Sequence, residues 1–376
     1  GAFLIGALQK IQSIVRCLDT DGLIVKRLFC QGELSSMNIQ DLILQNCLYG
    51  IDIQPLAIQI TKIRCAMHMK QYFEHCNSDW EQNFYTGNAL YTSNFREGFF
   101  DLVIGNPPYV GHKGGLKSFF RDFQNTKLGK KYNQERMDLF YYFFHLGIQI
   151  TNQTGIICFL TTNYYPTVDS AVKLRKHIIE ETIPFLFVDC NEYELFSSAP
   201  SQHNLMTFLC KTQICSTIKI MNITKKKRDS SDSIRHILRN ETSEVRVWNC
   251  QNDQYVEPST GFFLLKEQNP YIDILRTSSM TSLKDLFHVS QGMVTGVDKV
   301  KKKHALTNLH YESEVGEGVF VVPTSFFTNL PKEEQVLLKR WFKNSDITRF
   351  SLSDKKLGSY VIQLTSDTKL SNYPTI

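Results

Sequence analysis

Five consecutive residues of the chain combine groups that suit chemistry on a planar amine. The segment Gly105–Tyr109 reads Gly-Asn-Pro-Pro-Tyr and follows an apolar run at residues 101–104 that predicts a buried strand. Asn106 offers a side-chain oxygen as a hydrogen-bond acceptor, and the proline rings fix the backbone so that the carbonyl of Pro107 stays in place. Tyr109 offers a flat ring that can stack on a base. This segment, which we call the hook, predicts a site that holds a planar amine during methyl transfer.

The chemistry of such an amine explains why two acceptors are needed. The exocyclic amine of adenine is a poor nucleophile because its lone pair is delocalised into the ring. Acceptors on both N–H bonds, from the Asn106 side chain and the Pro107 carbonyl, would pull the nitrogen toward tetrahedral geometry and free the lone pair. The simpler alternative is a Pro-Pro turn after a strand with Tyr109 as a packing residue, since motifs this short also occur by chance.

The composition is that of an ordinary globular protein of about two domains. The chain has 376 residues, of which 42% are hydrophobic and 21% are charged. Its ten cysteines show no C-x-x-C and no Cys/His ligand spacing, which predicts reduced thiols, a cytosolic protein and no metal site. No apolar run is long enough to span a membrane. The net charge of +5 permits a nucleic-acid partner, and the basic runs 225–228 and 301–303 are either phosphate contacts or solvated loops.

Strand-like and helix-like segments alternate over the first half of the chain, which predicts an α/β fold with a largely parallel sheet and an antiparallel edge. The expected strands are residues 46–53, 83–86, 101–104, 155–160, 185–189 and 205–210, and the expected helices are residues 2–18, 55–72, 136–150 and 168–179. We expect a catalytic domain at 1–222, a linker or insertion at 223–281 and a smaller domain at 282–376. The last contains a basic-aromatic segment at 339–343.

Polar residues stand at the ends of three successive predicted strands. Asp52, Asn88 and Asn106 follow them in that order. Ligands of a doubly wound sheet bind outside the carboxyl ends of its strands. There, Asp52 can accept both hydrogen bonds of a ribose diol and Asn88 can bond an adenine edge, although an acid after a strand often caps a helix instead.

With these residues the chain resembles the gamma-class adenine-specific DNA methyltransferases, especially the long type found in combined type II restriction-modification enzymes. Asn106–Tyr109 matches the catalytic motif of that family, Tyr49–Pro55 resembles its acidic ribose-binding segment, and Gly87–Leu90 resembles the segment that contacts the adenine of the cofactor. Further matching segments are Gly1–Leu4 (the tail of the glycine motif), Asp138–Phe140, the strand from Gly155, Thr161–Asn163, Leu195–Phe196, and residues 291–296 and 345–350, which look like the start of a target-recognition domain.

The resemblance implies a Rossmann-like class I S-adenosylmethionine-dependent methyltransferase sheet, followed by a smaller mixed α/β target-recognition domain. It implies an enzyme of the prokaryotic cytoplasm that transfers a methyl group to a flipped adenine of double-stranded DNA, without a metal. Asn106 and Pro107 would bind the amine, and Tyr109 would hold one face of the base. Phe196 would hold the other face or, alternatively, be a plain core residue. The cofactor-binding residues implied are Gly1, Phe3, Asp52, Ile53, Asn88, Ala89, Asn106 and Pro108.

The chain departs from the family pattern at Gly1, which falls inside the glycine motif. The strand expected before that motif would lie in the middle of the sheet, where its absence would leave backbone groups unpaired. We therefore expect an N-terminal part of the same polypeptide to supply this strand, with a nuclease domain as a further candidate there.

Two alternative functions stay open. Enzymes that methylate RNA bases or a protein glutamine amide also carry Asn-Pro-Pro-Tyr, but the long region after residue 282 favours DNA. A DNA-specificity subunit that has lost catalysis would not need Asn106. The sequence does not define the DNA recognition site, the oligomeric state or whether cleavage accompanies methylation.

Overall fold

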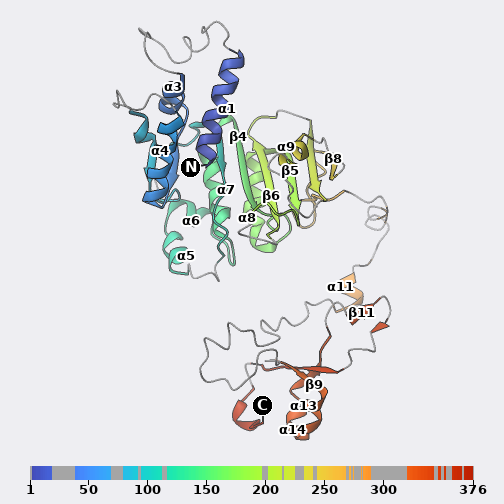
Figure 1. Ribbon diagram of the computed structural model, residues 1–376. Helices are drawn as coiled ribbons and strands as arrows, with labels where there is room; N and C mark the ends of the chain where they lie inside the picture. The colour runs from blue at the N-terminus through green and yellow to red at the C-terminus, as the bar shows by residue number, and fades with distance from the viewer. Residues whose placement is uncertain are drawn as a thin grey trace. The chain divides into compact units, whose positions relative to one another are not determined.

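The computed structural model falls into two compact units, residues 1–275 and 276–376, and each is described by itself (Figure 1). The structure describes residues 2–18, 39–68, 79–91, 95–111, 117–196, 202–213, 216–224, 233–239, 244–267, 271, 274, 281, 283–288, 320–342, 346–348, 351–352, 358–365 and 368–375. Gly1, residues 291–296 and the basic runs 225–228 and 301–303 lie outside this set.

The first unit contains a six-stranded mixed sheet. Its strands are β3 (Phe100–Gly105), β4 (Thr151–Thr162), β5 (Ile183–Asn191), β6 (Asn204–Cys210), β7 (Thr217–Ile223) and β8 (Val245–Gln251), in the order β3-β4-β6-β5-β7-β8. β3 is parallel to β4 and β5 to β7, whereas β6 is antiparallel to both of its neighbours and β8 is antiparallel to β7. The expected α/β class is confirmed, but the sheet is mixed and not largely parallel as expected.

The antiparallel strands agree with the expectation only in part. The edge strand β8 is antiparallel, as expected, but β6 is also antiparallel and lies inside the sheet, between β4 and β5. No helix separates β5 from β6 in the described chain, so the strand returns beside its predecessor in the opposite direction. Part of the range expected as a linker, 223–281, forms the edge strand β8, and Tyr255 and Phe263 from that range pack in the core.

A second, two-stranded sheet lies in the same unit. β1 (Gly50–Asp52) and β2 (Phe84–Thr86) are parallel, and α4 (Pro55–His68) lies between them in the chain. α1 (Ala2–Leu18), α3 (Ile39–Asn46) and the short helix η1 (Asp79–Asn83) belong to the same region. Gly50 allows close packing of α1, since a Cβ at this position would lie 2.6 Å from Cδ1 of Leu4. Their shared core consists of Leu8, Ile43, Leu44, Leu48, Ile58, Cys65, Trp80 and Phe84.

β1 and β3 are edge strands of their sheets within the described residues, because β1 pairs only with β2 and β3 only with β4. The two edges approach each other at their first residues. The ring of Tyr49 lies 5.6 Å from that of Phe99 and 5.5 Å from that of Phe100, measured between centroids. In the middle of β3, the side chain of Leu102 is 52% exposed.

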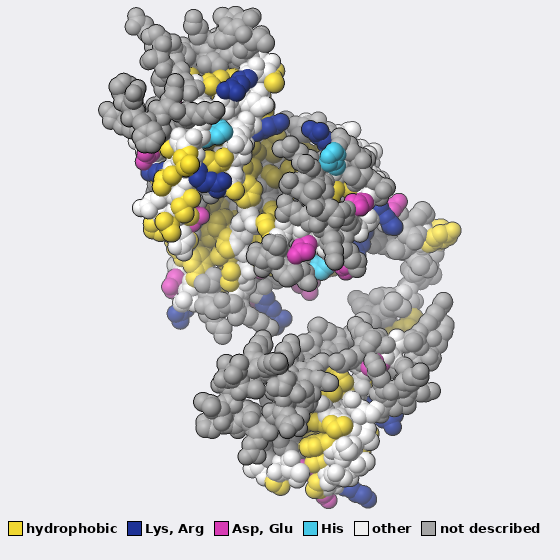
Figure 2. Space-filling model, viewed as in Figure 1, with side chains coloured by type: hydrophobic (Ala, Val, Ile, Leu, Met, Phe, Trp, Pro, Cys, Tyr) yellow, Lys and Arg dark blue, Asp and Glu magenta, His cyan; other side chains and the backbone are white. Residues whose placement is uncertain are grey.

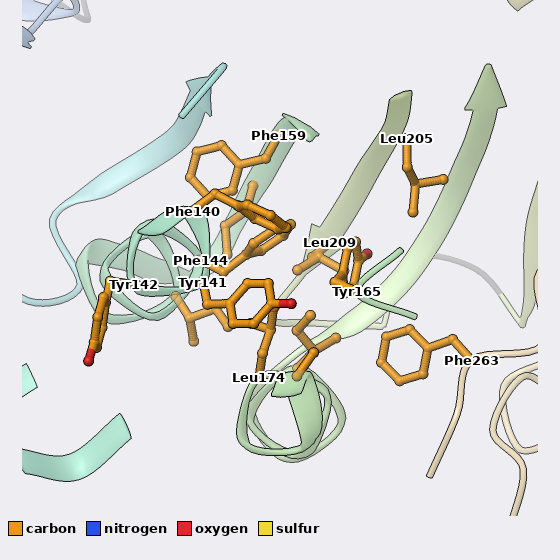
Figure 3. Close-up of a cluster of buried hydrophobic side chains, with 14 of the residues drawn as sticks. Phe140, Tyr141, Tyr142, Phe144, Phe159, Tyr165, Leu174, Leu205, Leu209 and Phe263 are labelled. Carbon is orange, nitrogen blue, oxygen red and sulfur yellow. The ribbon is translucent and has the colours of Figure 1, made fainter. Parts of the chain in front are cut away.

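The main core is built around α7 (Leu139–Ile150), most of whose side chains, including Phe140, Tyr141, Tyr142 and Phe144, are buried (Figure 3). A largely apolar helix needs neighbours on several sides, and here β4, α6 (Lys127–Tyr132) and α8 (Val172–Glu181) pack against it. Gly147 leaves room for the ring of Phe159, which would lie 2.9 Å from a Cβ at this position. The ring of Phe144 meets Phe159 edge to face at 5.0 Å.

The remaining elements are short. In the first unit they are α5 (Lys117–Phe123), η2 (Asp169–Ala171) and α9 (Ser233–Leu238). The second unit has a three-stranded antiparallel sheet of β9 (Val321–Pro323), β10 (Leu338–Arg340) and β13 (Ser359–Ile362), with β13 in the middle. It also contains α11 (Leu283–Leu286), α13 (Thr324–Asn329), α14 (Lys332–Gln335), the pair β11 (Ile347–Thr348) and β12 (Ser351–Leu352), and η5 (Leu370–Asn372). Among the described helices of both units, none has the length and apolar character needed to cross a bilayer.

A buried pair of histidines joins α7 to α8. Nδ1 of His145 lies 2.7 Å from Nδ1 of His177, and Nε2 of His177 lies 2.9 Å from the hydroxyl of Tyr132. The Tyr132 ring stacks on His145 with 3.7 Å between centroids. Burial, together with nearby lysines, lowers the pKa of His177 to about 4, and burial with the neighbouring His177 lowers the pKa of His145 well below its usual value.

This pair predicts that the protein loses stability in mild acid. Both folded-state pKa values lie below the unfolded value of about 6.5, so the unfolded chain binds protons first. The pair contributes its full stability above that value, and the contribution falls as the pH drops from about 6.5 toward 4. We expect the melting temperature to fall by several degrees between pH 7 and pH 5, as measured by calorimetry. The melting temperature of the variant His177→Gln should fall less over that interval. An equal fall in the wild type and the variant would contradict a role of the histidine pair in the loss of stability.

Candidate functional site

The hook begins where β3 ends. Gly105 is the last residue of β3 and pairs with Phe159 of β4, close enough that a Cβ on Gly105 would lie 3.2 Å from the ring. In the next residues burial alternates: Asn106 is exposed, Pro107 is buried and Pro108 is exposed. The side chain of Asn106 is therefore open to solvent while the backbone beside it is anchored by Pro107.

Tyr109 fixes the far end of the hook to the sheet. Its hydroxyl lies 3.0 Å from the carbonyl oxygen of Leu160 and is also within hydrogen-bond reach of the side-chain oxygen of Asn106. Its ring meets Phe140 edge to face at 6.1 Å. Burial raises the pKa of Tyr109 well above its usual value. The hydroxyl is therefore protonated at any working pH.

The start of α7 holds the chain that follows the hook. The amide of Leu139 donates to the carbonyl of Val110 at 3.0 Å, and Asp138 forms a β-bridge with Gly111. The ring of Tyr164 meets Phe140 at 5.9 Å, and its hydroxyl donates to Asp138. The segment Asp138–Phe140, expected only as framework, thus lies directly against the hook.

Phe140 is the residue whose role the sequence did not indicate. It is fully buried and contacts both Tyr109 and Tyr164. One aromatic in an apolar helix gives no sequence signal that separates it from its neighbours. Its position at the start of α7, two residues after Asp138, was the available clue.

Asp52 and Asn88 come together at the carboxyl ends of β1 and β2. The amide of Gly87 donates to the carbonyl of Asp52 at 2.9 Å, which keeps the two strand ends side by side. One carboxylate oxygen of Asp52 accepts from the amide of Gln54 at 2.8 Å, and the side-chain oxygen of Asn88 accepts from the amide of Leu90 at 3.0 Å. Asp52 is exposed, so its second carboxylate oxygen can receive hydroxyls of a ligand.

The Asn88 segment and the hook share one core. Leu90 is buried in the same cluster as Phe140, against which Tyr109 packs. Tyr91 meets the rings of Phe119 and Phe123 at 5.8 and 5.2 Å. The structure thus links the second and the third of the predicted strand-end residues through a common set of buried side chains.

The other predicted site residues have fewer contacts with the hook or with the Asp52 and Asn88 strand ends in the described chain. Phe196 follows β5 and is 37% exposed, and no ring contact joins it to Tyr109 in the described chain. Phe3 on α1 and Ile53 after β1 are 50% and 64% exposed, while Ala89 is half-buried beside Asn88. Gly1 lies outside the described residues, and the binding roles of all these residues stay predictions.

The comparisons with known proteins agree with the sequence-based resemblance. Residues 46–196 match the model of the Eco57I restriction-modification methylase family, and this range includes the hook. The type II methyltransferase M.HindII of Haemophilus influenzae is 25% identical over 232 residues, which are 56% of this chain and 42% of that protein. The type II restriction enzyme and methyltransferase RM.Eco57I of Escherichia coli is 22% identical over 290 residues, 69% of this chain and 26% of that protein.

Among solved structures, a modification subunit of a putative type I restriction enzyme from Vibrio vulnificus YJ016 is 14% identical, with a TM-score of 0.44 over 68% of this chain and 52% of that one. The chain spans less than half the length of the curated relatives it matches. The resemblance to the methylases of type II restriction-modification systems is confirmed by the family model and by these relatives.

Proposed function

We propose that this chain is the catalytic part of a site-specific DNA adenine methyltransferase of a prokaryotic, cytoplasmic restriction-modification system. It would transfer a methyl group from S-adenosylmethionine to the exocyclic amine of an adenine that has been flipped out of the duplex. The observation that carries the proposal is the exposed Asn106 side chain, which buried Pro107 and partly buried Tyr109 hold at the carboxyl end of β3. The match of residues 46–196 to a methylase family supports it.

The residues present fit S-adenosylmethionine. Asp52 is an exposed acid at the end of β1, and a Cβ at neighbouring Gly87 would meet nothing closer than Ile51 at 3.9 Å, so a ligand has room there. Asp52 would receive the ribose hydroxyls and Asn88 the adenine edge. When bound, this group supplies an electrophilic methyl group.

The hook then acts by positioning. The side-chain oxygen of Asn106 and the carbonyl of Pro107 accept the two N–H bonds of the amine, and the Tyr109 ring holds one face of the base. Fixing a nucleophile in this way removes much of the entropic barrier of a two-substrate reaction. In the described part of the chain, no group of three or more His, Cys, Asp or Glu side chains is arranged to hold a metal ion.

Replacing Asn106 tests the catalytic assignment. Asn106→Ala removes one of two fixed acceptors, and the loss of one such group in an active site slows a reaction by about 100- to 1,000-fold. We expect methyl incorporation into duplex DNA to fall by at least about 100-fold while DNA binding in a gel-shift assay changes little. Asn152→Ala is the control, since Asn152 is a half-buried asparagine whose side chain donates to Asp101, at the other end of β3 from the hook. Undiminished methylation by Asn106→Ala would refute the mechanism.

The substrate class needs its own test, because RNA bases and a protein glutamine amide also present a planar nitrogen. We expect the full-length protein to transfer labelled methyl groups to duplex DNA and not to RNA or protein. The restriction-modification names of the relatives support DNA. Transfer to RNA or protein alone would favour the first alternative. Binding of DNA without binding of S-adenosylmethionine in calorimetry would favour a silent specificity subunit.

We further propose that another segment of the same polypeptide pairs with the facing edges of β1 and β3. An open edge strand with apolar side chains is a template for strand addition, and Phe99 and Leu102 at the edge of β3 are 47% and 52% exposed. The outer face of α4 in the same unit is also apolar (Figure 2), through Leu56, Ile60, Ile63 and Met67. The combined name of RM.Eco57I makes a nuclease domain a candidate for part of that segment.

Hydrogen exchange tests this pairing. We expect the amides of β3 to exchange at least about tenfold more slowly in the full-length polypeptide than in a protein limited to residues 1–376. β7 serves as the control, because it is paired on both sides within this chain and should exchange alike in both proteins. Equal exchange of β3 in the two proteins would contradict the pairing.

A further inference from the structure

The Tyr109 hydroxyl faces two oxygen-bearing groups but has one proton to give. One neighbour is the carbonyl oxygen of Leu160 at 3.0 Å, and the other is the side-chain oxygen Oδ1 of Asn106, so the one hydroxyl proton faces two acceptors. A backbone carbonyl can only accept, whereas a side-chain amide offers an oxygen that accepts and an NH2 that donates. The two contacts can be satisfied together in one way only.

We assign the hydroxyl proton of Tyr109 to the carbonyl oxygen of Leu160. β3 and β4 stop pairing at Gly105 and Phe159, so Leu160 is the first residue of β4 past the end of that ladder. A carbonyl past the end of a ladder needs another donor, because leaving a partly buried acceptor unpaired is destabilising. Because burial keeps Tyr109 protonated, its hydroxyl is a reliable donor to Leu160.

The amide of Asn106 must then present its NH2 to the hydroxyl oxygen. The structure places the amide oxygen of Asn106 toward Tyr109. A half-turn of the amide exchanges oxygen and nitrogen in nearly the same space, and only the turned amide gives each of the two contacts a donor and an acceptor. The amide oxygen of Asn106 consequently turns away from Tyr109, toward solvent. In the opposite orientation the NH2 would face an incoming amine, and two donors would oppose each other.

We propose that the Tyr109 hydroxyl is a positioning group, which receives the Asn106 N–H, donates to the Leu160 carbonyl and so directs the Asn106 oxygen at the target amine. This inference rests on the proposed function and adds to it a role for the hydroxyl that is separate from stacking by the ring. It also gives a reason for tyrosine rather than phenylalanine at this position of the chain.

The variant Tyr109→Phe separates the two roles, because it keeps the ring and removes only the hydroxyl. In the full-length protein we expect kcat to fall about three- to tenfold, the range that one neutral hydrogen bond accounts for. The KM for DNA and the Kd for S-adenosylmethionine should stay within about twofold. The fluorescence of 2-aminopurine at the target position, which reports the flipped base, should be unchanged.

Tyr164→Phe is the matched control. The Tyr164 ring also packs on Phe140, but its hydroxyl bonds Asp138 and not Asn106. We expect its kcat to stay within about twofold of the wild type, with melting temperatures measured for both variants. An undiminished kcat in Tyr109→Phe, or an equal loss in the two variants, would overturn the proposal. Absence of any methyl transfer by the wild type would instead refute the proposed function.

A second readout does not depend on activity. With asparagine labelled by 15N, the side-chain NH2 signal of Asn106 can be assigned as the one missing from Asn106→Ala. Loss of the hydroxyl should shift this signal in Tyr109→Phe and leave it unmoved in Tyr164→Phe. An Asn106 signal that is the same in the wild type and in Tyr109→Phe would overturn the proposed orientation.

Discussion

The end of pairing between β3 and β4 is the constraint on which the rest of the site depends. The ladder stops at Gly105 and Phe159, and the chain leaves the sheet at that point as Asn-Pro-Pro-Tyr. Backbone groups past the end of a ladder need other partners, and Tyr109 supplies one for Leu160. The same contact holds the hook against the sheet. The exposed side chain of Asn106 is therefore carried by a backbone that is fixed in position.

The aromatic core gives that arrangement its stiffness. Phe140 supports the rings of both Tyr109 and Tyr164, and most residues of α7, which carries it, are buried. Close packing of this kind resists the displacement of a single ring. A site that works by holding an amine needs such a support, because a small misplacement of the reacting atoms is costly.

The sequence predicted the parts of the site that have a local signal. The strand before the hook, the strand end at Asp52 and the alternation of strands and helices follow from apolar periodicity and turn residues. Sequence periodicity carries no information on which strands become neighbours. The interior position of β6, the edge strand β8 within an expected linker and the meeting of His145 with His177 therefore could not be predicted. They depend on contacts between residues distant in the chain.

The central claim is that the hook methylates the exocyclic amine of adenine in duplex DNA. The most direct measurement is mass spectrometry of nucleosides from duplex DNA incubated with the full-length protein and S-adenosylmethionine. We expect N6-methyladenine as the methylated nucleoside, and a loss of at least about 100-fold in its yield when Asn106 is replaced by alanine. Methylation of cytosine instead, or methylated adenine that persists without Asn106, would contradict it.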